Sequence, residues 1–460
     1  MAETRSTEAR SEKECFQIGH RLRLNFLAAM AHEKPDKPVM RQLLPSTTHA
    51  PDGRNEIILS YQRIIRLVDR LAWMLSRRLS QGGVSPQTVG YLGPSDPRHL
   101  LIALAATNSA KALLLSPRNS VSMHQVLLEE SQSALLLCDN PFATTATQIR
   151  KQRDIDLLFI PDFVDGPVEP IPYVDTWFTS HGKPLVTLHT TGSTGNPAPV
   201  TMTHSALGSI DRQQKLPEKD PTGGKCQLEV LAKASTVYMA FPLFHVAGFG
   251  LSCYLILAGC TLLFGYQRQA PSVAALRTAL KVSNVDGALL PTSIIDELSL
   301  NADLLEAVPR LLYIFGGGGS ISRGAGDIIV QRTRLLNGLD STEFSDQEPQ
   351  GEDFELVLQR DESCLPLQAV FQNLPHLQEW RTNDVVRRHP HIPDYWEYRY
   401  RLDDLIVFST GEKMNPLPVE ARLRDIAGVK EALVVGNKQS YPAVLLKWMS
   451  TSGMEPRATR

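Results

Sequence analysis

The sequence lacks the charge imbalance that marks nucleic-acid-binding proteins. Its 460 residues include 47 lysines and arginines and 49 aspartates and glutamates, which gives a formal net charge of −2. A surface that binds a phosphate backbone needs a clear excess of basic side chains, so we expect no nucleic acid as partner. Hydrophobic residues make up 42% and charged residues 21%, which excludes collagen-like and highly charged disordered chains. The length predicts two to four structural units.

Cysteines are few and scattered. The sequence has six, none of them in a CxxC pair or in a cluster with the spacing of a zinc site. Scattered cysteines in a long chain are typical of buried thiols in a reducing compartment. Residues 1–14 also lack the apolar segment of a secretory signal, so we expect a cytoplasmic protein.

Long apolar runs are almost absent as well. Residues 246–266 form one uncharged stretch, which is long enough in principle to span a bilayer. Glycines interrupt this stretch at Gly248, Gly250 and Gly259. A buried helix over 247–257, a turn at Gly259 and a strand over 261–264 explain it better, and we expect no membrane as partner.

The best-known catalytic fingerprints are missing too. The sequence contains no GxxxxGK[ST] loop and no GxGxxG set between a strand and a helix. HExxH and GxSxG are also absent, so the sequence lacks the usual motifs of the zincins and of the common serine hydrolases.

What the sequence does have is a regular alternation of strand-like apolar runs and helical patterns. This alternation predicts an α/β fold with two consecutive βαβ-type parts, each around a parallel sheet. A small β-rich part is expected from about residue 343 to 402, followed by a hairpin-like pair, a helix over 418–426 and a strand over 431–435. The expected strands of the two α/β parts are 88–92, 112–115 and 134–137, and then 185–189, 236–241, 261–264, 287–289 and 312–315.

Two glycine clusters follow predicted strands. The run His189-Thr190-Thr191-Gly192-Ser193-Thr194-Gly195-Asn196-Pro197 comes directly after a strand and is rich in hydroxyls. Such a run lets a phosphate approach the backbone N–H groups, although by itself it also fits a surface turn. The second cluster, Gly316-Gly317-Gly318-Gly319-Ser320, gives a flat ligand access to the backbone, or else forms a sharp loop.

The first run resembles the phosphate loop of the adenylate-forming (AMP-binding) superfamily, which includes acyl-CoA synthetases, nonribosomal peptide synthetase (NRPS) adenylation domains and carboxylic acid reductases. Further segments resemble motifs of that family in its order and approximate spacing. They are Phe241–Gly248 (acyl pocket), Gly316–Ser322 (adenine turn), Ser341-Thr342-Glu343 (end of YGxTE), Arg381–Asp384 (RTGD) and Arg401–Asp404 (GRxDD).

A narrower resemblance points to the adenylation domain of fungal NRPS-like adenylate-forming reductases. It is carried by Tyr91–Asp96, Ser116–Ser120 and Ser409–Pro416. Those enzymes continue into carrier and reductase domains, so the resemblance covers only their adenylation portion. It implies a large N-terminal domain over 1–402 that contains both α/β parts and the β-rich part. A truncated α+β C-terminal lid is then expected over 403–460.

The resemblance implies that ATP and Mg²⁺ convert a carboxylic acid into an acyl-adenylate. The catalytic residues would be His245, Thr342 and Glu343, with Glu343 also holding Mg²⁺ and Thr342 the α-phosphate. Asp384 would accept hydrogen bonds from the ribose, with Arg401 alongside. The β,γ-phosphates would lie against Thr190, Thr191, Gly192, Ser193, Thr194 and Gly195, and the adenine against Gly318 and Gly319. Asp340 and Ser341 would be further cofactor-binding residues.

His245 bears on the choice of acid. In amino-acid-activating members the matching residue is aspartate, which pairs with the α-ammonium group of the substrate. Histidine is no permanent counter-charge, and residues 246–249 beside it are apolar, so an aryl or alkyl acid without an α-amine is expected. The alternative is a histidine that is simply satisfied in the core.

The sequence departs from the family pattern at several positions. Ala198 replaces the lysine after the phosphate loop, Tyr400 and Asn383 replace glycines, and Leu339-Asp340 stands where the family has Tyr-Gly. The C-terminal KGK- or KGT-like lysine motif is also missing. We therefore hold two interpretations: a ligase that passes the acyl group to a carrier protein or to CoA, in secondary metabolism, or a degenerate nucleotide- or partner-binding module. A fragment of a longer gene is a third.

Overall fold

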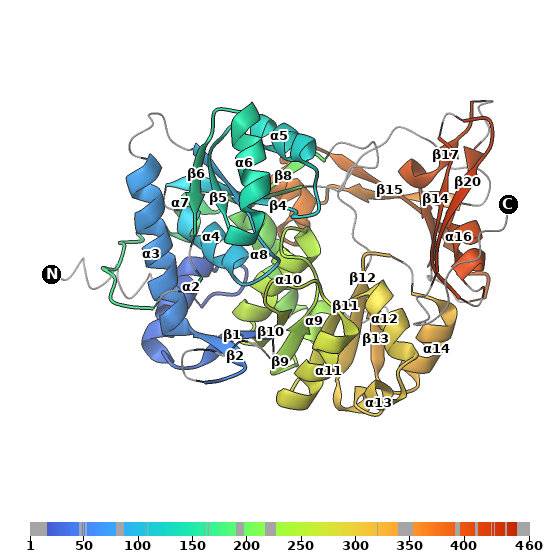
Figure 1. Cartoon of the computed structure of the whole chain (residues 1–460), viewed down its shortest axis with the longest axis horizontal. Helices are drawn as coiled ribbons and strands as arrows, with labels where there is room; N and C mark the ends of the chain where they lie inside the picture. Colours follow the sequence, from blue (N-terminus) through green and yellow to red (C-terminus); the bar gives the residue numbers. More distant parts are fainter. Residues whose placement is uncertain are drawn as a thin grey trace. The chain divides into compact units, whose positions relative to one another are not determined.

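The computed structural model describes most of the chain, in two compact units. The first unit comprises residues 1–340 and 360–378, and the second comprises residues 341–359 and 379–460 (Figure 1). The domain boundary between residues 402 and 403 stays a prediction. The described residues are 16–45, 48, 50, 53–79, 87–107, 109–160, 162–163, 165–189, 197–216, 227–319, 321–338, 353–391, 396–409, 413–424, 426, 428–437 and 439–448.

One sheet of the first unit has six strands in the order β6-β5-β3-β4-β7-β8. All neighbours pair in parallel except β7 and β8, so the predicted parallel sheet is confirmed. The strands are β3 (Gln87–Leu92), β4 (Ala110–Leu115), β5 (Ser133–Cys138), β6 (Asp156–Phe159), β7 (Pro184–His189) and β8 (Pro199–Thr203).

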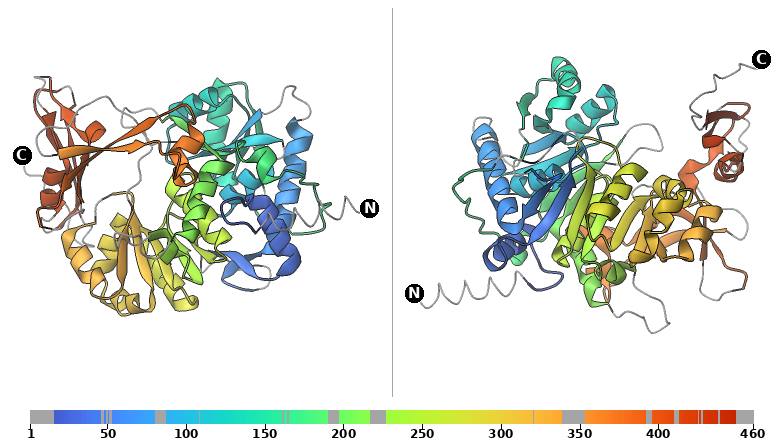
Figure 2. Two further views of the ribbon diagram at one scale, coloured as in Figure 1. Left: turned by 180° about the vertical axis from the view of Figure 1, so that it is seen from behind. Right: turned by 60° about the horizontal axis from the view of Figure 1, so that its bottom comes forward.

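Helices follow these strands as the alternation predicts. The 19-residue α3 (Tyr61–Leu79) buries an apolar face that recurs every three to four residues. Ser120 caps the N-terminus of α5 by accepting a hydrogen bond from the Met123 N–H at 3.3 Å. Helices α5 and α6 lie side by side in both views of Figure 2, in teal. The helices around this sheet are α3, α4 (Arg98–Ala106), α5 (Val121–Glu130), α6 (Ala143–Gln152), α7 (Trp177–Ser180) and α8 (His204–Arg212).

The second sheet of this unit has seven strands in the order β13-β12-β11-β9-β10-β1-β2. Only β2 runs antiparallel to its neighbour. The strands are β1 (Pro38–Leu43), β2 (Glu56–Ser60), β9 (Thr236–Met239), β10 (Thr261–Tyr266), β11 (Gly287–Pro291), β12 (Tyr313–Gly317) and β13 (Arg334–Asn337). The remaining helices of the unit are α2 (Arg23–Glu33), α9 (Gln227–Leu231), α10 (Val246–Leu257), α11 (Val273–Val282), α12 (Thr292–Ser299), α13 (Ala302–Leu305), α14 (Arg323–Val330) and α15 (Ala369–Asn373).

The uncharged stretch 246–266 folds as the sequence predicts. Helix α10 is buried over its last ten residues, and Gly259 follows at φ +85°, a left-handed conformation that favours glycine. Strand β10 then enters the centre of the second sheet. Among the helices that the structure describes, none combines the length and the apolar character needed to cross a bilayer.

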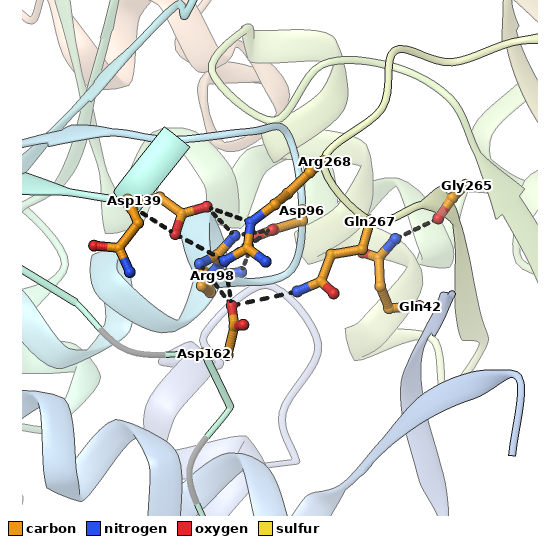
Figure 3. Close-up of polar contacts among 9 residues, drawn as sticks. Gln42, Asp96, Arg98, Asp139, Asp162, Gly265, Gln267 and Arg268 are labelled. Carbon is orange, nitrogen blue, oxygen red and sulfur yellow. Dashed lines mark hydrogen bonds and ion pairs between the residues drawn. The ribbon is translucent and has the colours of Figure 1, made fainter. Parts of the chain in front are cut away.

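Five charged side chains form a partly buried cluster, here called the ionic clasp: Asp96, Arg98, Asp139, Asp162 and Arg268 (Figure 3). Arg98, Asp96 and Asp139 are each 3% exposed or less. Arg98 contacts Asp96 at 2.6 Å and Asp139 at 2.9 Å, while Arg268 grips Asp139 with two hydrogen bonds of 3.0 Å. Asp96 and Asp139 follow strands of the first sheet and Arg268 follows β10, so the clasp joins the two sheets.

The second unit is built from small antiparallel sheets. Three strands pair in the order β14-β15-β16, and two hairpins, β17–β18 and β19–β20, follow in the chain. Helix α16 (Leu417–Arg424) packs on β19. The strands are β14 (Asp353–Gln359), β15 (Glu379–Arg388), β16 (Trp396–Arg401), β17 (Ile406–Val407), β18 (Lys413–Met414), β19 (Val429–Val435) and β20 (Ala443–Trp448). The expected β-rich part, hairpin and helix are confirmed.

The clasp gives a stability prediction. Asp139→Asn removes a charge shared by two arginines and leaves the buried Arg98 guanidinium with less compensation. We expect a loss of about 3 kcal/mol in the free energy of unfolding. Urea denaturation followed by circular dichroism measures it. The control is Asp327→Asn, which breaks the exposed pair of Arg323 and Asp327 and should change stability by less than about 0.5 kcal/mol. Equal effects of the two substitutions would contradict a stabilising clasp.

Candidate functional site

The candidate site of the first unit lies where parallel strands end. Ligands of α/β sheets bind beyond the carboxyl ends of the strands, because the connecting loops there converge. Ser95 follows β3, Ser116 follows β4, and His189 is the last residue of β7. From the second sheet, the turn that carries His245 follows β9, and Gly318 follows β12.

The turn over residues 241–245, here called the His245 turn, is held from two sides. The Ser95 hydroxyl accepts a hydrogen bond from the Leu243 N–H at 2.8 Å. On the other side, the first turn of α10 packs on the Pro242 carbonyl. A Cβ atom at Gly248 would lie 2.1 Å from that carbonyl oxygen, so only glycine fits there. The position of His245 therefore depends on a serine in the first sheet and a glycine in α10.

The His245 ring is half-buried among other rings. It lies 4.7 Å from the Phe244 ring and 6.2 Å from the His189 ring, between centroids. Burial is the main cause that lowers the pKa of His245 to about 4, and the nearby His189 and Arg118 act in the same direction. The imidazole is therefore neutral near pH 7 and offers one donor and one acceptor rather than a charge.

His189 is held more tightly. Its ring is 4% exposed and stacks on Phe244 at 6.3 Å with an interplanar angle of 4°. The Nε2 atom accepts a hydrogen bond from the Ser116 N–H at 2.9 Å. An accepting Nε2 places the proton on Nδ1, so this contact fixes the neutral tautomer of the ring.

Two further histidines lie near this group without polar partners among the described residues. His99 and His124 are fully buried, and neither ring nitrogen of either side chain is hydrogen-bonded there. His99 contacts the Tyr91 ring edge-on at 4.8 Å. Burial lowers the pKa of His99 to about 3 and, together with the field of His189, that of His124 to about 4. Among the described residues, the groups that act on His245 therefore include imidazoles and Arg118 but no carboxylate.

The glycine turn after β12 leaves its backbone accessible. A Cβ atom at Gly317 would lie 3.1 Å from the Phe241 ring, so this glycine packs against the His245 turn. Gly318 has φ +81°, and apart from its chain neighbours no atom of the described residues lies within 4 Å of the position that a Cβ would take. Gly319 follows at φ +155°. An open backbone beside an aromatic ring suits a flat ligand, and the adenine-binding role expected for Gly318 and Gly319 stays a prediction.

The second unit brings together the two residues expected at the ribose. Asp384 and Arg401 are direct partners in the pairing of β15 with β16. The Asp384 carboxylate is 1% exposed, and its N–H donates to the Thr382 hydroxyl at 3.1 Å. Asn383, where the family has glycine, has φ +62°. Asparagine tolerates this conformation better than most residues, so the backbone shape survives the exchange. Tyr400 lies in β16 opposite Val385, and its pKa is raised by burial.

Several predicted site residues lie outside the described part of the chain. Within the described part, no group of three histidine, cysteine, aspartate or glutamate side chains is placed to hold a metal ion. The roles expected for the phosphate loop and for Mg²⁺ therefore stay predictions. The residues concerned are Thr190, Thr191, Gly192, Ser193, Thr194, Gly195, Asp340, Ser341, Thr342 and Glu343.

Sequence reasoning missed the residues that support His245. Ser95, Ser116 and Arg118 lie in segments that carried the family resemblance, but no role could be given to them. Their signal is their position directly after strands β3 and β4. The ionic clasp was missed entirely.

Comparison with known families gives a consistent result. Residues 27–345 match the family described as AMP-binding enzyme. Residues 403–458 match the family described as AMP-binding enzyme C-terminal domain.

Individual proteins agree with this match. A carboxylic acid reductase of Neurospora crassa is 29% identical over 93% of this chain and 44% of its own length. The adenylate-forming reductase Nps10 of Heterobasidion annosum is 26% identical over 59% of this chain and 27% of its own length. The chain thus spans less than half of these relatives. The structure of O-succinylbenzoate coenzyme A synthetase from Bacillus subtilis superposes with a TM-score of 0.65 at 17% identity, covering 93% of this chain and 89% of that one. It confirms the α/β fold alone.

Gly248 gives a test of the His245 turn. Gly248→Ala forces the Pro242 carbonyl to move, and we expect a loss of about 1–3 kcal/mol in stability. Gly250→Ala is the matched control, because its Cβ would meet Ile210 at 3.4 Å, an ordinary contact, and alanine favours the helix. Thermal unfolding of both variants measures the difference. A Gly248→Ala protein as stable as Gly250→Ala would contradict the assigned packing.

The buried histidines predict sensitivity to acid. Because the pKa of His99 is lowered in the fold, the unfolded chain takes up a proton first as the pH falls below about 6.5, and stability falls. In the His99→Leu variant the slope of stability against pH between 6 and 4 should decrease by about 1.4 kcal/mol per pH unit. Urea unfolding at pH 6, 5 and 4 measures the slope. The exposed residue His32 supplies the control His32→Leu, whose slope should match that of the wild type. An unchanged slope in His99→Leu would refute the prediction.

Proposed function

The chain belongs to the AMP-binding enzyme family, and we propose that it uses ATP to activate a carboxylic acid that has no α-amino group. A carboxylate oxygen attacks the α-phosphorus of ATP, the bond to the β-phosphate oxygen breaks, and an acyl-adenylate and pyrophosphate form. The mixed anhydride then acylates a nucleophile, and AMP leaves.

The environment of His245 carries this proposal. An α-ammonium group brought to His245 would meet a neutral imidazole, the Phe244 ring and the His189 ring. It would lose its hydration without gaining a counter-charge, which is strongly unfavourable. An aryl or alkyl acid has no such group, and the apolar residues Val246, Ala247 and Phe249 follow His245 in the chain.

The described residues fit the nucleotide that this reaction needs. The open backbone at Gly318, directly after the Gly317 that packs on Phe241, is suited to the adenine ring. The buried Asp384 carboxylate is suited to accept hydrogen bonds from the ribose hydroxyls, with Arg401 beside it in the ladder. Glu343 is the residue proposed to hold Mg²⁺, which supplies positive charge to the phosphates.

We further propose that the acyl acceptor is a thiol of a carrier protein or of CoA, in secondary metabolism. The similarity to an adenylate-forming reductase supports a carrier protein, because the resemblance implies that such enzymes continue into a carrier domain. The second candidate, a nucleotide-binding module without turnover, is favoured by Ala198 and Tyr400, which replace residues of the family pattern.

ATP–pyrophosphate exchange with paired acids tests the proposed selectivity. Each pair shares one side chain and differs only in the α-amino group, as with 3-phenylpropanoate and phenylalanine, or hexanoate and norleucine. For the acids that are accepted, we expect the amine-free acid to exchange at least about 100-fold faster, because an unpaired buried ammonium costs about 3 kcal/mol or more.

His245→Asp serves as the reciprocal variant in the same assay. A carboxylate at this position should raise exchange with the amino acids and lower it with the amine-free acids. Preference of the wild-type protein for the amino acids would refute the assigned substrate class. ATP binding by calorimetry without exchange for any acid would instead establish the nucleotide-binding module.

A further inference from the structure

The turn after β4, here called the Arg118 turn, is fastened to the end of β7. The Ser116 N–H donates to Nε2 of His189, and the Ser116 hydroxyl accepts a hydrogen bond from the Arg118 N–H at 3.3 Å. Helix α5 begins directly afterwards, with Ser120 as its N-cap. Arg118 is thus held on a short turn between two fixed points, close to the candidate site.

The order of strands places the Arg118 turn on one flank of β7. Strand β7 lies between β4 and β8, about 4.8 Å from each. Beyond β4 the chain reaches Arg118, and just before β8 it passes Ala198. The end of β7, from which the sequence continues into the hydroxyl- and glycine-rich run 190–195, therefore has Arg118 on one side and an uncharged residue on the other.

The Arg118 guanidinium has no polar partner within the described part of the chain. Its side chain is exposed, and no described residue forms a hydrogen bond or an ion pair with its guanidinium. Arg98 and Arg268, which also lie at strand ends of this unit, are both neutralised by the aspartates of the ionic clasp (Figure 3).

The groups that act on His245 are likewise uncharged or positive. His189 and Arg118 both lower its pKa, and no described carboxylate opposes them. His124, fully buried near His189, has no hydrogen-bond partner among the described residues and offers a neutral ring nitrogen rather than a negative charge. An unpaired cation among neutral groups attracts an anion from solution.

We propose that Arg118 binds the polyphosphate of the incoming ATP and supplies the positive charge that position 198 does not. This assignment rests on the proposed function for the identity of the nucleotide. A guanidinium donates paired hydrogen bonds to phosphate oxygens, and the triphosphate carries several negative charges where the acid carries one. The experiment below distinguishes whether Arg118 binds the phosphates of ATP or the carboxylate of the acid.

Calorimetric titration with ATP and with AMP tests the assignment directly. Arg118→Gln should weaken ATP binding at least about tenfold, the loss of a charge-assisted hydrogen bond, and leave AMP binding within about twofold of the wild type. Arg118→Lys should recover part of the loss. The control is Arg150→Gln, which removes an exposed arginine of α6 and should alter neither affinity. Circular dichroism confirms that the variants are folded.

A rescue variant makes the test independent of folding. Ala198→Lys in the Arg118→Gln background restores a cation on the opposite flank of β7, and we expect ATP affinity to recover while AMP affinity stays unchanged. Equal losses for ATP and AMP, or an effect only on the KM of the acid in pyrophosphate exchange, would overturn the role of Arg118. If Arg118→Gln leaves ATP affinity unchanged while the wild-type protein catalyses pyrophosphate exchange, the role of Arg118 is refuted and the proposed function stands. If ATP binding depends on Arg118 but no acid supports exchange, the role of Arg118 stands and the proposed function is refuted.

Discussion

The first unit depends on the pairing of one buried cation, the Arg98 guanidinium, with carboxylates. The Arg98 guanidinium, 3% exposed at the start of α4, is stable only where carboxylates surround it. Two of these, Asp96 and Asp139, come from the ends of β3 and β5, and Arg268 completes the cluster from the connection after β10. Burial opposes the ionisation of Asp139, but hydrogen bonds from Arg268 and Arg98 outweigh it and hold the pKa of this carboxyl below its usual value. Arg268 adopts φ +60°, a conformation rare outside glycine, in making these contacts.

The clasp and the candidate site are linked through a single residue. Ser95 directly precedes Asp96, and its hydroxyl holds the amide of Leu243 in the His245 turn. A shift of the β3 connection would therefore move the turn that carries His245. Because Gly248 and Gly317 have no side chains, this turn can pack closely against α10 and against the glycine turn after β12. The site is thus positioned by one ionic cluster, one serine and two close backbone approaches.

Local periodicity was sufficient to predict most of the fold. The strands 88–92, 112–115 and 134–137 were expected within two residues of their observed ends, because each is a short apolar run bounded by turn residues. Strands β1 and β8 were not expected. β1 pairs with β10, more than 200 residues away in the chain, and β8 is an edge strand that begins with proline. The ionic clasp was not predicted either, because its charged residues are distant from one another in the chain. They are scattered from position 96 to position 268 and form no sequence pattern.

Charge distinguishes the candidate positions, each of which is considered within its own unit. At Asp384 a carboxylate is buried beside Arg401 in the ladder, where a donor-rich sugar would match it. At His245 the described neighbours are rings without a negative charge, which under the proposed function favours an acid that carries no ammonium group. At Arg118 a cation has no partner among the described residues, which suits the most negative part of the reacting system. Within the described part of the first unit, both arginines of the clasp are paired with aspartates, whereas the Arg118 guanidinium has no such partner. A ligase that activates an amine-free acid brings two anions together, the carboxylate and ATP, and neither substrate supplies a cation. Such an enzyme therefore needs an unpaired cationic side chain near the reacting groups.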